Sequence, residues 1–143
     1  MPGICQEFMV MIIYIFRKSD GYRTAVAADD YCYLTTTGRR SGRPHEIEIW
    51  YAESADGRTL YLLAGGRDAS DWVRNLRAHA GCTVRIGSRE APPLQATGRL
   101  LDEADDEAAA ARTLVFEKFQ PRNGGDLSGW RAAALPVAID LST

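Results

Sequence analysis

The sequence predicts an α+β fold that is mainly β, with antiparallel strands in a sheet or small barrel and two or three helices around it. Stretches of alternating apolar residues recur along the chain and are separated by turn residues, whereas helical spacing is confined to a few segments. Strand–helix–strand crossovers are too few for a doubly wound parallel sheet. The chain also contains neither a Walker loop nor a dinucleotide-binding glycine loop.

Length and composition indicate one domain. The 143 residues, 45% of them hydrophobic, are enough for one core and too few for two, so we expect a single domain over residues 30–143 after an N-terminal extension over 1–29. The 17 basic and 19 acidic residues give a net charge of −2, which argues against nucleic acid as a partner. Cys5, Cys32 and Cys82 are odd in number and widely separated, which favours reduced thiols and a cytoplasmic location.

The apolar run over residues 8–16 is too short to span a bilayer, and its positive charges, Arg17 and Lys18, follow it. A buried N-terminal helix or strand, or a start site placed too far upstream, is the favoured interpretation. Contact with a membrane surface or a partner is the alternative.

The first half of the predicted domain contains a hairpin and a helix. Residues 46–51 alternate with the period of a half-buried strand, and a tight turn at 55–58 leads into a second strand at 60–64. After two glycines, Asp68 is positioned to cap a helix that ends near His79, with Asp71 in its positive first turn. Its apolar stripe comprises Trp72, Val73 and Leu76.

The second half alternates strand, strand, helix and strand. Residues 82–86 and 94–101 have strand periodicity, and acidic residues from Asp102 begin a long helix in which Ala111, Val115 and Phe119 recur at helical spacing. A loop follows over 120–127, then a short helical turn over 128–134 and a final strand over 135–141.

An arginine-rich turn follows the β-branched run at 34–37. Arg39, Arg40 and Arg43 lie between or beside glycines, and Ser41 adds a hydroxyl donor. Planar guanidinium groups suit phosphate and carboxylate, so this turn is predicted to bind a small polyanion.

A second informative stretch covers residues 64–77. Ala64, Gly65, Gly66 and Arg67 lead from a strand into the predicted helix, and glycines without side chains let a flat or phosphorylated ligand approach the backbone. We expect this stretch and the arginine turn to form two sides of one site.

Other catalytic chemistry is weakly supported. His45 and His79 have no metal-ligand spacing or hydrolase elbow around them, so no metal is expected. Glu46 and Glu48 lie on one face of a strand and are interpreted as surface carboxylates.

Residues 36–44, the strand after them, and residues 71–76 together resemble the deazaflavin-dependent nitroreductase and quinone reductase family, a branch of the split β-barrel flavin-binding superfamily. The likeness runs from about Asp30 to Ile86, with a looser fit through the last strand. It implies a split β-barrel that binds coenzyme F420 (8-hydroxy-5-deazaflavin) and transfers hydride to a quinone, nitro compound or enone.

The resemblance also assigns cofactor contacts residue by residue. The anionic tail would be held by Arg39, Arg40 and Ser41, assisted by Arg43, and His45 stands where the family often has a basic residue. The deazaflavin ring would lie along the barrel beside Ile47, and residues 64–67 would offer backbone and charge to the ring or its ribityl chain. Trp72 and Asn75 would close the site from the helix. The catalytic residue stays unassigned, since Tyr31, Tyr33, Tyr51 or water could supply the proton. An FMN oxidoreductase of the same superfamily, or a non-catalytic carrier of flavin, deazaflavin or haem, is the alternative, and the protein is expected to be a monomer or homodimer.

Overall fold

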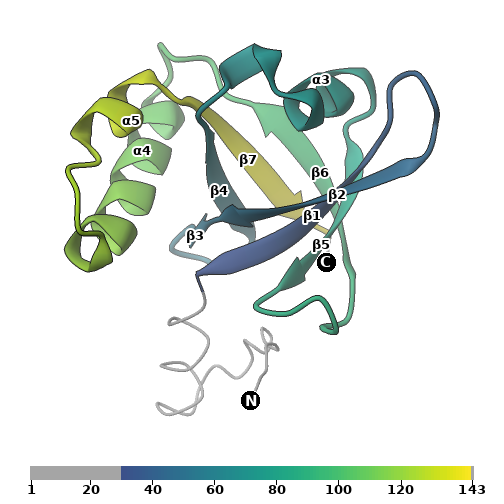
Figure 1. Cartoon of the computed structure of the whole chain (residues 1–143), viewed down its shortest axis with the longest axis horizontal. Helices are drawn as coiled ribbons and strands as arrows, with labels where there is room; N and C mark the ends of the chain where they lie inside the picture. Colours follow the sequence, from purple (N-terminus) through teal and green to yellow (C-terminus); the bar gives the residue numbers. More distant parts are fainter. Residues whose placement is uncertain (1–29, 143) are drawn as a thin grey trace.

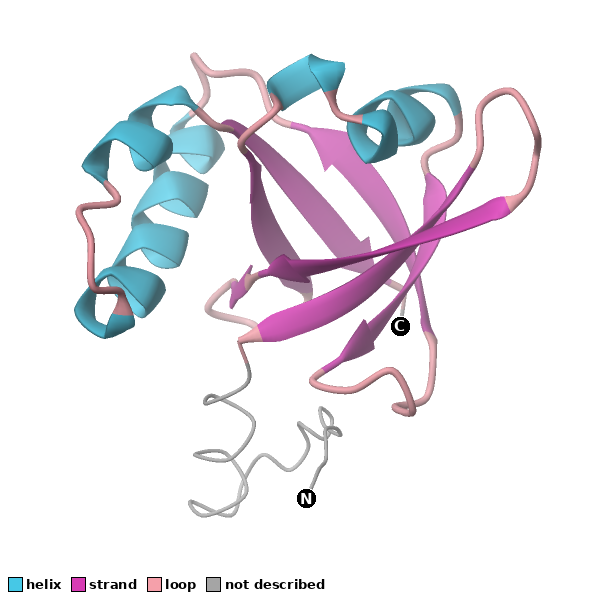
Figure 2. Cartoon of the chain, in the orientation of Figure 1, coloured by secondary structure: helices cyan, strands magenta, loops and turns pink. Residues whose placement is uncertain are grey.

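The computed structural model describes residues 30–142, and the apolar run at 8–16, Cys5 and the predicted extension lie outside this range. Seven antiparallel strands form one curled sheet in the order β2-β1-β5-β6-β7-β4-β3. Figure 1 labels the elements, and Figure 2 shows the strands curling around a common interior. The strands are β1 (Tyr31–Thr37), β2 (Pro44–Trp50), β3 (Ala52–Glu53), β4 (Thr59–Ala64), β5 (Gly81–Ile86), β6 (Leu94–Leu100) and β7 (Leu135–Leu141).

Chain connectivity closes the sheet into a barrel. β2 and β3 stand at opposite ends of the strand order, yet only Tyr51 separates them in the chain. The two edges must therefore approach each other, and Tyr51, 1% exposed, packs in the interior at this junction. The prediction of a mainly β, α+β split barrel is confirmed.

Two apolar cores lie on opposite sides of the sheet. The barrel interior is filled by alternate residues of the strands, and Val73 and Leu76 of the helix α3 (Asp71–Ala78) pack onto it. On the outer face of β4 and β7, the helices α4 (Asp106–Phe119) and α5 (Ser128–Ala133) bury a second cluster. Figure 1 shows α3 beside the β1–β2 hairpin, with α4 and α5 on the other flank.

Most predicted elements are present, but two helix starts were placed too early. Asp68 lies in a 3-10 turn over Arg67–Ala69, and α3 begins at Asp71 after Ser70. The predicted start at Asp102 is likewise wrong, because residues 102–105 form a turn and α4 begins at Asp106. In both cases the acidic residue that was expected at the N-terminus of the helix lies in a tight turn before it.

Among residues 30–142, no helix is both long and apolar enough to cross a membrane, and no cluster of His, Cys, Asp and Glu could hold a metal ion.

Candidate functional site

The arginine turn closes the hairpin between β1 and β2. The Gly38 N–H donates to the Arg43 carbonyl at 2.8 Å, and the Gly42 N–H donates to the Gly38 carbonyl at 2.9 Å. Gly42 has a φ of +73°, which a residue with a side chain adopts only at a cost. Ser41 Oγ accepts the Arg43 N–H at 3.1 Å, so the hydroxyl stabilises the turn and keeps its proton available to a ligand.

Arg39 fastens this turn to α3. Its backbone N–H and its Nη1 both donate to Asn75 Oδ1, at 3.1 Å and 3.0 Å, and its Nη2 lies 3.3 Å from an oxygen of Asp71. Asn75 is only 3% exposed, and its Nδ2 donates to the buried Thr36 Oγ1 at 3.2 Å. The two stretches singled out in the sequence therefore meet through a partly buried hydrogen-bond network.

The other two arginines of the turn remain available. Arg40 and Arg43 are exposed, and within residues 30–142 their guanidinium groups form no hydrogen bond or ion pair. Their fork-shaped donors can therefore meet an anionic ligand without first breaking an ion pair.

His45 lies directly opposite Thr36 in the β1–β2 register, and Ile47 lies two residues further along on the same face. A Cβ at Gly38 would stand 2.6 Å from Ser41 Oγ and 2.7 Å from His45 Nε2. Two polar side chains thus converge over the bare backbone of Gly38. Ile47 is partly buried against the barrel core.

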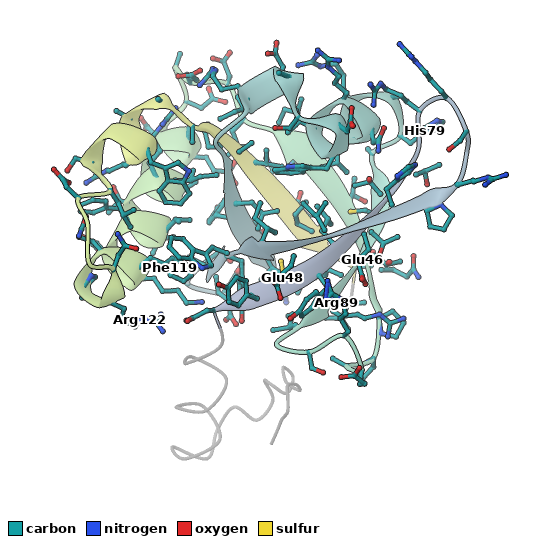
Figure 3. The ribbon with its side chains drawn as sticks, viewed as in Figure 1. Glu46, Glu48, His79, Arg89, Phe119 and Arg122 are labelled. Atoms are coloured by element: carbon teal, nitrogen blue, oxygen red, sulfur yellow. The ribbon has the colours of Figure 1, made fainter. Side chains whose placement is uncertain are left out.

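The two strand glutamates face the opposite side of the sheet. Glu46 accepts a hydrogen bond from Arg89 Nε at 3.1 Å, and Glu48 accepts one from the Tyr33 hydroxyl at 2.8 Å. Figure 3 shows Glu46, Glu48 and Arg89 gathered together. Burial and the Glu48 hydrogen bond raise the pKa of Tyr33 to about 12. These carboxylates therefore lie on the face opposite His45 and do not oppose an anion bound there.

The end of β4 brings bare backbone next to an indole ring. Ala64 is buried, whereas Gly65 and Gly66 are exposed. A Cβ at Gly65 would lie 3.5 Å from Nε1 of Trp130 in α5. Trp130 in turn packs edge-on against Trp50, with ring centroids 5.8 Å apart. The backbone of this turn is thus open beside an aromatic side chain.

Arg67 has an unusual backbone conformation, and its side chain is bound to residues distant in sequence. Its φ of +52° is in the left-handed region, where non-glycine residues are strained and often mark functional sites. Its guanidinium donates to the Ala133 carbonyl at 2.5 Å and pairs with Glu103. Arg67 therefore contributes its backbone to the turn after β4, while its guanidinium is bound to Ala133 and Glu103.

Trp72 is partly buried against the barrel core, so it anchors α3 beside Asn75. The candidate proton donors are spread out: Tyr31 is 41% exposed at the start of β1, Tyr33 lies on the outer face, and Tyr51 is buried. The partners that sequence reasoning missed are Thr36 and Glu103. Thr36 lies within the 36–44 motif but was assigned no role there, and Glu103 lies in no motif; each acquires its role through contacts with residues distant in sequence.

Comparisons with known proteins identify the family and the fold. The family model for F420H(2)-dependent quinone reductases matches residues 11–139. A search of curated proteins finds no significant match.

Solved structures share the fold at low identity. The haem storage protein HutZ from Vibrio cholerae is 11% identical, with 90% of this chain and 92% of that chain covered and a TM-score of 0.69. An F420-H2 dependent reductase (FDR-A) is 23% identical, with coverages of 79% and 94% and a TM-score of 0.58. A structure described as an F420 reductase is 17% identical, with coverages of 87% and 95% and the same TM-score of 0.58.

Because the family model for F420H(2)-dependent quinone reductases spans most of the chain, the cofactor is coenzyme F420. The chain belongs to the F420H2-dependent quinone reductase family and is an F420-dependent oxidoreductase.

Proposed function

We propose that this protein transfers hydride from reduced F420 to an electron-poor acceptor: a quinone, a nitro compound or a conjugated enone. The observation that carries the proposal is the arginine turn, which Arg39 fixes against α3 while Arg40 and Arg43 stay exposed. Bound F420 would supply the hydride chemistry, and the protein supplies position and electrostatics.

The residues present fit the cofactor. A phosphorylated, carboxylated tail matches the exposed guanidinium groups of Arg40 and Arg43, and the Ser41 hydroxyl can donate a further hydrogen bond. The absence of a Cβ at Gly38 lets the Ser41 and His45 side chains pack directly over the backbone of the turn, which places both polar groups beside the exposed arginines. This arrangement supports a tail site on the turn.

Arg39 and Asn75 then have a different role from the one that the resemblance assigned. Their hydrogen-bonding groups are largely used on each other, so they support the tail site by holding the turn in place. Arg67 contributes backbone, since its side chain is bound to Ala133 and Glu103. Ile47 and Trp72 provide apolar surface for the ring.

The acceptor is proposed to bind beside Gly65, where the backbone is exposed and the Trp130 indole is adjacent. Flat, electron-poor rings pack favourably against an aromatic side chain. The proton that accompanies the hydride comes from water in this proposal. Tyr31 and Tyr33 alternate onto the outer face of β1, where Tyr33 donates to Glu48, and Tyr51 is buried.

The tail site is tested by titrating the protein with F420 and following fluorescence quenching. Replacing both Arg40 and Arg43 with alanine should weaken binding by about 2–4 kcal/mol, at about 1–2 kcal/mol for each screened, charge-assisted contact. Arg58→Ala, which removes an exposed arginine from the β3–β4 turn, is the matched control. Raising the salt concentration should weaken the wild type more than the double variant. Equal affinities for wild type and double variant would refute the tail site.

The reaction is tested by mixing reduced F420 and protein with a panel of quinones, nitroaromatics and enones. Oxidation of the cofactor only in the presence of an acceptor supports the proposal. Tight binding without oxidation would favour a non-catalytic carrier. An FMN spectrum that survives desalting, with no retention of F420, would favour the FMN enzyme.

A further inference from the structure

Glu103, in the turn before α4, joins two arginines from different parts of the chain. One carboxylate oxygen pairs with Arg67 of the turn after β4, and the other accepts a hydrogen bond from Arg112 Nη2 at 3.1 Å. In this pair the Arg112 side chain is 14% exposed and the Glu103 side chain is 48% exposed, so solvent screens the carboxylate more than the guanidinium. We call Glu103, Arg67 and Arg112 the Glu103 latch.

Both arginines of the latch also bind the end of α5. Arg67 donates to the Ala133 carbonyl at 2.5 Å, and Arg112 donates to the Ala132 carbonyl at 3.0 Å and to that of Arg131. The last carbonyls of a helix lack intrahelical donors and favour cations nearby. Because α5 has only six residues, it is too short to be stable alone and depends on such tertiary contacts.

The latch holds both sides of the Gly65–Trp130 contact. Trp130 belongs to α5, and Arg67 follows Gly65 by two residues. The indole Nε1 lies 3.5 Å from the Cβ position at Gly65, a separation that a small shift of α5 would change. The left-handed backbone of Arg67 indicates that the surrounding contacts fix this turn.

We propose that Glu103 is a positioning residue for the hydride acceptor: through Arg67 and Arg112 it sets the spacing between Trp130 and Gly65, and so determines which acceptor rings fit beside the cofactor. This inference rests on the proposed function. It assigns Glu103 no contact with substrate or cofactor. Its effect should therefore appear in acceptor selection and not in F420 affinity.

The first test is Glu103→Ala, compared with Glu117→Ala, which removes an exposed carboxylate of α4 that has no partner among residues 30–142. Hydrogen exchange over residues 127–134 should accelerate in Glu103→Ala alone. With a quinone acceptor, its KM should rise about fivefold to tenfold, while the F420 dissociation constant stays within about twofold of wild type. Glu103→Gln, which keeps the shape but weakens both ion pairs, should give an intermediate KM.

A second variant tests the spacing without disturbing the latch. Gly65→Ala places a methyl group in contact with the Trp130 indole, whereas Gly81→Ala adds one with nothing within 4 Å. Gly65→Ala should discriminate against bulky quinones relative to small ones, and Gly81→Ala should not.

Unchanged exchange over 127–134 in Glu103→Ala would overturn the latch. Faster exchange with an unchanged KM would overturn its role in acceptor selection, as would a Gly65→Ala enzyme with wild-type preference. A wild-type protein that binds F420 but reduces no acceptor would instead overturn the proposed function.

Discussion

Replacing Asn75 with alanine should both destabilise the barrel and release the arginine turn. Its side chain links three groups, since Oδ1 accepts from the backbone and guanidinium of Arg39 and Nδ2 donates to Thr36. Asn75 and Thr36 are 3% and 1% exposed, so water cannot easily replace these hydrogen bonds. Alanine would leave the Thr36 hydroxyl without this donor in the interior.

The expected loss follows from the hydrogen bonds. The two neutral ones are worth about 1 kcal/mol each, and the one from the Arg39 guanidinium about 1.5 kcal/mol, the low end for a charged donor because that side chain is 23% exposed. Because the three share one side chain and are not additive, we expect the free energy of unfolding to fall by about 2–4 kcal/mol.

Urea unfolding followed by circular dichroism measures this loss, with Arg77→Ala as the control because Arg77 is exposed on the same helix. Titration with F420 should show weaker binding for Asn75→Ala than for the wild type, because the arginine turn loses its contact with α3 and becomes more mobile. A loss below about 1 kcal/mol would refute the argument, because the three hydrogen bonds of the Asn75 side chain would then contribute less than one ordinary one. Normal F420 affinity in a destabilised variant would show that the turn does not need this anchor.

Two further predictions concern the fold. The Arg99 hydrogen bond lowers the pKa of Asp140. Ionised Asp140 therefore contributes its full stabilisation above the ordinary pKa of 3.8 and loses it as the pH falls through the lowered pKa of the folded protein. Arg99→Ala should reduce the acid-induced drop in the urea midpoint, and an identical drop in the variant and the wild type would contradict this role. Gly98→Ala would put a Cβ 2.7 Å from Leu76 Cδ2 and should cost about 1–3 kcal/mol, against about 0.5 kcal/mol or less for Gly81→Ala in the same unfolding assay. Equal stability of the two alanine variants would show that Leu76 yields without cost.

Local patterns predicted the strands well because each has one face on an apolar core. In β5, Cys82, Val84 and Ile86 alternate with less buried residues, as their spacing indicated. The helix starts were predicted less well. Acidic residues favour a helix N-terminus and a preceding turn alike, so Asp68 and Asp102 gave no means of choosing between the two.

The candidate site divides in the same way. The sequence by itself identified the arginine turn and the glycine turn, because glycine freedom and guanidinium chemistry are properties of short segments. It did not show that Arg39 is bound to Asn75 while Arg40 and Arg43 stay exposed. The three arginines have the same side chain and similar neighbours in the sequence, so nothing local distinguishes them.

The sequence alone thus determined the fold class and the family, and it identified the arginine turn and the glycine turn as the proposed cofactor site. Only the tertiary structure decided that Glu46 and Glu48 face away from the turn, and that Glu103 joins Arg67 to Arg112. The physical reason is the range of the interactions. Strand periodicity and turn conformation are set by neighbours in the chain, whereas the partner of a charged side chain depends on which distant segments the closed barrel brings together.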